Sequence, residues 1–149
     1  MKKISGFVMP YNRPNFYNEV LKPHTFKNFA EERRLIPIYC KHHEEELLGI
    51  WTKLIDSYEG LYAEGSIMNE DFIRFIFDNH MENDLKFSIC YQTSLEDAIN
   101  NGRSRRRINT DTYLPVVYGP ENKLTIPEIS IVDSPSFDGT YGKMFKKAR

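Results

Sequence analysis

The segment Tyr39–Ile67, with the sequence YCKHHEEELLGIWTKLIDSYEGLYAEGSI, decides how we expect this chain to fold. An apolar strand ends in the adjacent histidines His42 and His43, and the runs Leu48–Ile55 and Leu61–Ile67 follow on either side of a glycine-containing turn. Alternating apolar residues around such a turn are typical of a β-hairpin. The segment therefore predicts a hairpin that stiffens a histidine-bearing loop at the end of a strand.

Most of the other elements also have the two-residue period of strands. The run Leu35–Cys40 is rich in β-forming residues, but Pro37 cannot donate to a ladder, so we expect an edge strand or a bulge there. The same pattern predicts further strands at Lys3–Met9, Asn18–Lys22, Leu85–Thr93, Tyr113–Tyr118 and Leu124–Val132.

Helices are predicted at three places. Asn69 can cap the helix of the segment NEDFIRFIFDNHM, whose apolar residues recur at helical spacing. Thr25 is the expected N-cap of a short helix over Phe26–Arg33, and Ser94–Ile99 is expected to be a capped turn or short helix. About seven strands with two or three helices predict an α+β domain built mainly as an antiparallel, barrel-like sheet with flanking helices.

The composition is that of an ordinary soluble domain. A chain of 149 residues that is 40% hydrophobic and 28% charged can form one domain over residues 1–149. Its net charge of −1 argues against a general attraction to nucleic acid or to anionic membranes. The two cysteines favour a reducing compartment, and neither a secretory signal nor a run of about 18 apolar residues is present. We expect a cytoplasmic protein that needs no cofactor.

Ser88 is the first candidate for a chemical role. It alternates with Phe87, Ile89 and Tyr91, so it faces outward or into a cleft if those three residues belong to the core. A serine hydroxyl becomes a useful nucleophile only beside a base, which is most often a histidine oriented by a third group. On pattern alone, a half-exposed strand serine without a task fits Ser88 as well.

The adjacent histidines have more than one interpretation. His42 and His43 precede three glutamates, which fits a solvated loop as well as a base, and the two histidines can differ in this respect. Together with Cys40 they offer metal ligands, but zinc sites usually have paired ligand spacings and no second pair is present, so we predict no metal site. Cys40 and Cys90 lie in apolar strands, where a small buried thiol is the ordinary case.

Four short motifs follow one another along most of the chain. The third, Phe87–Tyr91 (FSICY), and the fourth, Glu128–Val132 (EISIV), are similar to L-S-I-G-F and E-V-S-L-V. In this order the motifs resemble the markers of the prohead maturation protease family of tailed bacteriophages, which is related to the herpesvirus assemblin proteases. The remaining matches are Ser5–Val8 with Glu19–Phe26, then Tyr39–His42 with Leu48–Trp51 and Gly60–Gly65, and finally Pro135.

The resemblance implies a herpesvirus-protease-like fold and a serine endopeptidase that cleaves scaffold or capsid-precursor polypeptide within the assembling prohead. Carried over by position, it implies Ser88 as the nucleophile, His42 as the general base and Glu128 as the group that orients the imidazole. Relatives also suggest a homodimer. Because herpesvirus relatives use a second histidine as the third member, three alternatives to the glutamate stay open, namely His24, His43 and His80.

Two positions depart from the family pattern. His43 stands where an acidic or amide residue is common, and Cys90 stands where the family has a glycine two residues after the serine. A glycine adopts backbone conformations that a cysteine does not, which bears on how the strand presents N–H groups to an oxyanion. The alternative of a catalytically inactive capsid-assembly protein that binds scaffold or capsid subunits therefore stays open.

The segment Asn101–Thr110 is polar and strongly basic, so we expect a flexible loop. It can be a solvated loop without a task. Alternatively, it lies near the cleft, where it attracts an acidic scaffold segment or supplies charge beside the oxyanion, as the resemblance to assemblins allows. The arginines concerned are Arg103, Arg105, Arg106 and Arg107.

Overall fold

The computed structural model describes residues 1–92 and 115–146. Two α-helices and a 3-10 helix accompany nine strands in this part of the chain. The elements are, in order, β1 (Lys2–Pro10), β2 (Glu19–Leu21), α1 (Lys27–Glu31), β3 (Ile36–Cys40), β4 (His43–Asp56), β5 (Gly60–Ile67), α2 (Glu70–Asp78), β6 (Lys86–Gln92), β7 (Val116–Tyr118), the 3-10 helix η1 (Pro120–Asn122), β8 (Thr125–Val132) and β9 (Tyr141–Met144).

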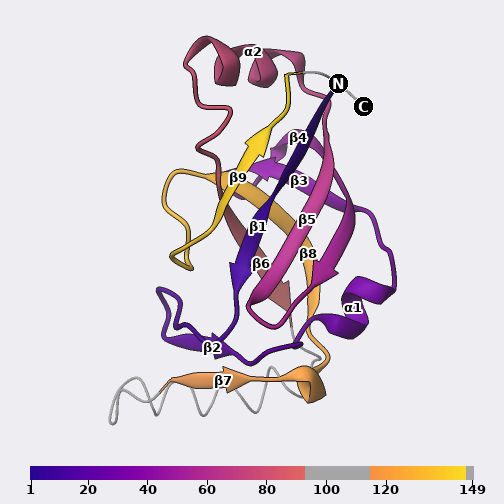
Figure 1. Cartoon of the computed structure of the whole chain (residues 1–149), viewed down its shortest axis with the longest axis vertical. Coiled ribbons are helices and arrows are strands. Elements are labelled where there is room, and N and C mark those ends of the chain that lie inside the picture. Colours follow the sequence, from indigo (N-terminus) through magenta and orange to yellow (C-terminus); the bar gives the residue numbers. More distant parts are fainter. Residues whose placement is uncertain (93–114, 147–149) are drawn as a thin grey trace.

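Seven of the strands form one curled sheet, in the order β6-β8-β3-β4-β5-β1-β9, and β2 pairs with β7 in a separate two-stranded sheet (Figure 1). The large sheet curls so far that its two ends meet, because the Leu85 N–H donates to the Gly142 carbonyl at 3.1 Å. Most neighbours in it are antiparallel, while β3 and β8 are parallel. The predicted α+β, mainly antiparallel and barrel-like architecture is confirmed.

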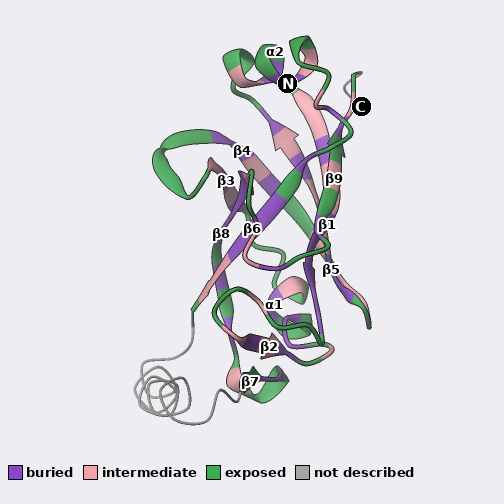
Figure 2. Ribbon diagram, turned by 90° about the vertical axis from the view of Figure 1, so that its left-hand side faces the viewer, coloured by how far each residue is buried: buried purple, intermediate pink, exposed green. Residues whose placement is uncertain are grey.

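The interior of the curl is filled by large apolar side chains. Figure 2 shows buried residues in most strands of the sheet. The Trp51 ring meets the Phe87 ring edge to face at 5.5 Å, and its Nε1–H donates to the Ile129 carbonyl at 3.0 Å. Phe87 lies directly over Gly142, where an added Cβ would be 2.3 Å from the ring. The core thereby fixes the position of β6, the strand that carries Ser88.

The predicted hairpin is present, since β4 and β5 are antiparallel neighbours. The histidines before it lie differently from the prediction of a loop. Cys40 pairs with His43, so Lys41 and His42 alone form the turn between β3 and β4, and both have positive φ angles of 51° and 64°. Two residues with positive φ are typical of a type I′ turn. His43 is therefore the first residue of β4, whose initial residues are exposed and extend beyond the apolar run.

Asn69 caps α2 as predicted, because its side chain accepts a hydrogen bond from the Phe72 N–H at 3.0 Å. The prediction for the first helix is wrong in its cap and its length. Thr25 does not cap α1; its hydroxyl donates to the Lys22 carbonyl at 2.6 Å, and the helix spans only Lys27–Glu31. The N-cap position falls instead on Phe26, whose side chain has no acceptor for a cap hydrogen bond.

Pro37 is regularly paired with Ile50 of β4, and the bulge that was one of the two predicted alternatives lies further along β3. The ladder of β3 with β4 shifts register after Ile38 and again after Tyr39, and β8 pairs with β3 only at Cys40. The missing N–H of Pro37 is therefore away from the β8 pairing. Strand β9 was not predicted, and the elements predicted at Ser94–Ile99 and Asn101–Thr110 lie outside the described residues.

Candidate active site

His42 and Glu128 form a hydrogen-bonded pair between the β3–β4 turn and strand β8. His42 Nδ1 bonds the Oε1 atom of Glu128, whose carboxylate is buried, while the imidazole side chain is 42% exposed. This hydrogen bond raises the pKa of His42, and partial burial opposes the rise. With Nδ1 occupied by the carboxylate, Nε2 is the ring nitrogen that can take a proton from a neighbouring group.

Ser130 connects both members of this pair. Its fully buried hydroxyl donates to Oε2 of Glu128 and accepts the backbone N–H of His42 at 3.1 Å. The turn is further held by the Lys41 N–H, which donates to the Ile131 carbonyl at 3.0 Å. Sequence reasoning gave Ser130 no role, although its position two residues after Glu128 on a strand places both side chains on one face.

Ser88 lies on the neighbouring strand, on the same face. In the antiparallel β6–β8 ladder, Ser88 is directly opposite Ser130 and Cys90 is directly opposite Glu128. Side chains of directly opposite residues have Cβ atoms about 4.5–5.5 Å apart. The structure therefore brings Ser88 beside Ser130, the serine that holds both His42 and Glu128. The catalytic roles of Ser88, His42 and Glu128 stay predictions.

The segment after β8 covers Ser88, which is buried. Ser136 Oγ lies 3.3 Å from Ser88 Oγ, and either hydroxyl can be the donor. The segment is anchored by the buried Phe137 and by Thr140, whose hydroxyl accepts the Phe87 N–H at 3.1 Å. No sequence pattern pointed to Ser136, because a contact between a loop and a distant strand leaves no periodic pattern.

Both cysteines remain ordinary thiols next to this site. Burial raises the pKa of Cys90, and the nearby negative charge of Glu128 raises it further. Burial likewise raises the pKa of Cys40, together with a hydrogen bond to Glu46. Since the thiolate is the nucleophilic form of cysteine, these environments disfavour either thiol as the nucleophile.

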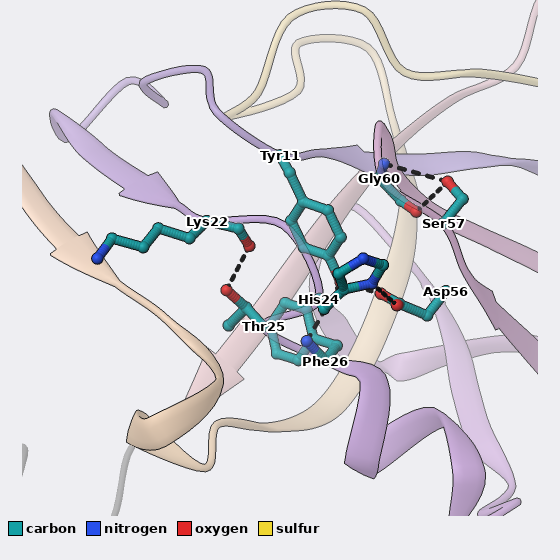
Figure 3. A network of polar contacts seen from close by, with 8 residues as sticks. All are labelled: Tyr11, Lys22, His24, Thr25, Phe26, Asp56, Ser57 and Gly60. Atoms are coloured by element: carbon teal, nitrogen blue, oxygen red, sulfur yellow. Dashed lines mark hydrogen bonds and ion pairs between the residues drawn. The ribbon is translucent and has the colours of Figure 1, made fainter.

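His24, one of the alternative third members, is paired elsewhere (Figure 3). Its Nδ1 lies 2.5 Å from Oδ2 of Asp56, and the other carboxylate oxygen accepts the Tyr11 hydroxyl, also at 2.5 Å. The Tyr11 oxygen accepts the Phe26 N–H at 3.2 Å. This network joins the start of α1 to the end of β4.

The other histidines are on the surface. His43 lies 3.6 Å from Glu45, and both side chains are exposed. His80 is exposed directly after α2. Within residues 1–92 and 115–146, no three or more His, Cys, Asp and Glu side chains are grouped as metal ligands would be, and no helix there has the length and apolar character of a membrane span.

A curled sheet of mostly antiparallel strands with few helices is the fold of the herpesvirus proteases. The sequence pattern of the caudovirus prohead serine proteases matches residues 1–148, and the chain belongs to this family. No curated protein sequence matches the chain.

Among solved structures, the chain is similar to a Kaposi's sarcoma-associated herpesvirus (KSHV) protease in complex with a hexapeptide phosphonate inhibitor, with a TM-score of 0.61 and 16% identity over 98% of this chain. The varicella-zoster virus protease gives a TM-score of 0.54 and 11% identity over 98% of this chain. The chain spans 65% and 64% of those two proteases, respectively. At this identity the similarity shows the shared fold.

Proposed function

We propose that this protein is a serine endopeptidase of virion assembly, a single protease-like domain that cleaves scaffold or capsid-precursor polypeptide inside the prohead, in the cytoplasm of the host cell. Ser88 is the nucleophile, His42 the general base and Glu128 the group that orients the imidazole. The observation that carries the proposal is the hydrogen bond between His42 and Glu128 on the face of the sheet where Ser88 lies. Membership of the prohead protease family supports the same reaction.

The reaction follows from the arrangement of these groups. Ser88 Oγ attacks the carbonyl carbon of the scissile peptide bond while its proton passes to His42 Nε2. The imidazolium that forms is stabilised by the Glu128 carboxylate on Nδ1. His42 then gives the proton to the departing amine, and the C–N bond breaks to leave an acyl-enzyme. Water, deprotonated by His42, attacks the acyl carbon, the ester C–O bond breaks, and His42 returns the proton to the Ser88 oxygen.

The direct test is to co-express the protein with the capsid precursor of the same phage and to map the fragments by mass spectrometry. Ser88→Ala should abolish processing, with a loss in kcat on the order of 10⁴–10⁶. Ser66→Ala is the matched control, since this half-buried serine lies on β5. Processing that continues in Ser88→Ala would refute the assignment of the nucleophile.

The second candidate is a catalytically inactive assembly protein that binds scaffold or capsid subunits. The observation that favours it is Cys90, which stands in the glycine position of the family motif, directly opposite Glu128. Such a protein would bind the precursor, and neither the unaltered chain nor Ser88→Ala would cleave it. Precursor fragments that form with the unaltered chain but not with Ser88→Ala exclude this candidate.

We also propose that the protein forms a homodimer. The KSHV protease, to which the chain is 15% identical over 99% of its length with a TM-score of 0.54, is described in complex with a dimer disruptor. Sedimentation velocity across a range of protein concentrations tests the proposal. A dimer that appears as the concentration rises supports it, whereas a monomer at all concentrations contradicts it.

A further inference from the structure

Phe16, in the segment between β1 and β2, is the most exposed of the large hydrophobic side chains in the described residues, with 84% of its surface accessible. The ring of Tyr17, which is also exposed, meets the Phe16 ring edge to face at 5.4 Å. Single exposed apolar side chains are common. Binding residues, however, lie disproportionately on loops that a rigid scaffold positions, and aromatic residues are enriched among them.

The loop is held in place by a partly buried polar network. The Asn15 side-chain oxygen accepts the N–H groups of Tyr17 and Glu19, both at 2.9 Å, and its amide donates to Oε1 of Glu19 at 3.0 Å. Glu19 is buried and also accepts the Tyr91 hydroxyl at 2.5 Å. Because Tyr91 belongs to β6, the network ties the aromatic loop to the strand that carries Ser88.

A second connection leads directly to the proposed nucleophile. The Phe16 N–H donates to the Ser136 carbonyl at 2.7 Å, and Ser136 Oγ lies 3.3 Å from Ser88 Oγ. Only one residue, Ser136, stands between the backbone of Phe16 and the hydroxyl of Ser88. An extended substrate advances about 3.3 Å per residue. An extended polypeptide that runs from Ser88 along the Ser136 side would reach the loop of Phe16 and Tyr17 within about three residues of its scissile bond.

We propose that Phe16, supported by Tyr17, forms a substrate subsite that binds an apolar or aromatic side chain of the precursor polypeptide near the scissile bond. The inference rests on the proposed function and adds to it the kind of sequence that is cleaved. Because the backbone of this loop is already held by hydrogen bonds, binding to the rings costs little conformational entropy for ordering the loop. Phe16 determines specificity and takes no part in the proton transfers.

The test uses short overlapping peptides of the capsid precursor and compares Phe16→Ala with the unaltered chain. For peptides with a large apolar residue near the cleavage site, the KM should rise about 10- to 100-fold, and Phe16→Leu should restore most of the affinity. For the same peptides with that residue replaced by alanine, the two proteins should differ little. Tyr58→Ala is the matched control, because Tyr58 is a 68% exposed aromatic residue in the β4–β5 turn.

Fluorophosphonate labelling separates this inference from the proposed function. The labelling rate of Ser88 in Phe16→Ala should fall far less than kcat/KM for the apolar peptides. If the unaltered chain neither reacts with the fluorophosphonate nor cleaves the peptides, the proposed function fails. The subsite is then tested by the peptide affinity of Ser88→Ala, measured with and without the additional change Phe16→Ala. Equal peptide affinity, or equal KM, in the presence and absence of the Phe16 ring overturns the inference.

Discussion

Replacing Glu128 by glutamine probes the histidine–carboxylate pair with little change of shape. The carboxylate accepts two hydrogen bonds, one from His42 Nδ1 and one from the Ser130 hydroxyl. A glutamine side chain has one acceptor oxygen and a donor amide, so it cannot accept both bonds. The fully buried Ser130 hydroxyl would lose its acceptor if the amide faced it, whereas the imidazole is partly exposed. We therefore expect the amide oxygen to face Ser130 and the NH₂ to face His42.

That orientation determines the size of the effect. When an NH₂ group faces Nδ1, this nitrogen must accept, so the neutral ring carries its proton on Nε2 and cannot take one from Ser88. The same change of carboxylate to amide in a serine protease of another fold lowers kcat by about 10⁴, which is the loss we expect for Glu128→Gln. The rise in the His42 pKa, caused mainly by the Glu128 hydrogen bond, is also removed. The acid limb of kcat/KM, which falls as His42 becomes protonated, then moves to lower pH.

The assay is cleavage of a precursor peptide across a range of pH, with Glu45→Gln as the control. Glu45 lies beside the adjacent histidine, His43, at 3.6 Å, and both are exposed, so its neutralisation should leave kcat and the acid limb unchanged. The reasoning is refuted if Glu128→Gln retains kcat within about tenfold of the unaltered chain. It is equally refuted if the acid limb stays in place.

Three further predictions concern stability. Ser130→Ala leaves a buried carboxylate oxygen of Glu128 and the His42 N–H without their hydrogen-bond partner. The free energy of unfolding, measured in urea, should therefore fall by about 1–3 kcal/mol. An unchanged value would contradict the role of Ser130 in holding the pair. Gly142→Ala places a Cβ 2.3 Å from the Phe87 ring and should lower the free energy of unfolding by about 1–3 kcal/mol. An unaltered Tm would show that Phe87 can move aside without destabilising the protein. Glu128 raises the pKa of His42, so the stability that this pair contributes is fully present below the unfolded pKa of about 6.5 and is lost as the pH rises through the folded pKa. His42→Asn should therefore lower Tm more at about pH 6 than at about pH 9. Equal losses of Tm at the two pH values would contradict a stabilising ion pair.

Sequence reasoning predicted the elements whose signal is periodic or local. The hairpin after His43 has alternating apolar residues around a turn, and α2 has both its cap at Asn69 and an apolar stripe. The resemblance to the prohead proteases also pointed to Ser88, His42 and Glu128. The structure pairs His42 with Glu128 and places Ser88 on the strand next to Glu128, and their catalytic roles stay predictions. This arrangement depends on the register between strands, which no single segment reveals.

The features that the sequence missed depend on contacts between distant segments. Ser136 reaches Ser88 from the loop after β8, which a hydrogen bond between Thr140 and the Phe87 N–H ties to β6. Thr25 is a residue type that often caps helices, but its hydroxyl donates to the carbonyl three residues earlier. Strand β9 is four residues long and is defined by its pairing with β1. In each case the tertiary environment outweighs local propensity.

The central claim is that the hydroxyl of Ser88 is activated by the imidazole of His42. Mass spectrometry of the peptide that carries a fluorophosphonate adduct, in the unaltered chain and in His42→Asn, tests it most directly, since asparagine tolerates the positive φ of this turn. The account predicts a single adduct on Ser88 whose formation is lost in the variant. An adduct on another residue, or labelling of Ser88 at the same rate without the imidazole, would contradict it.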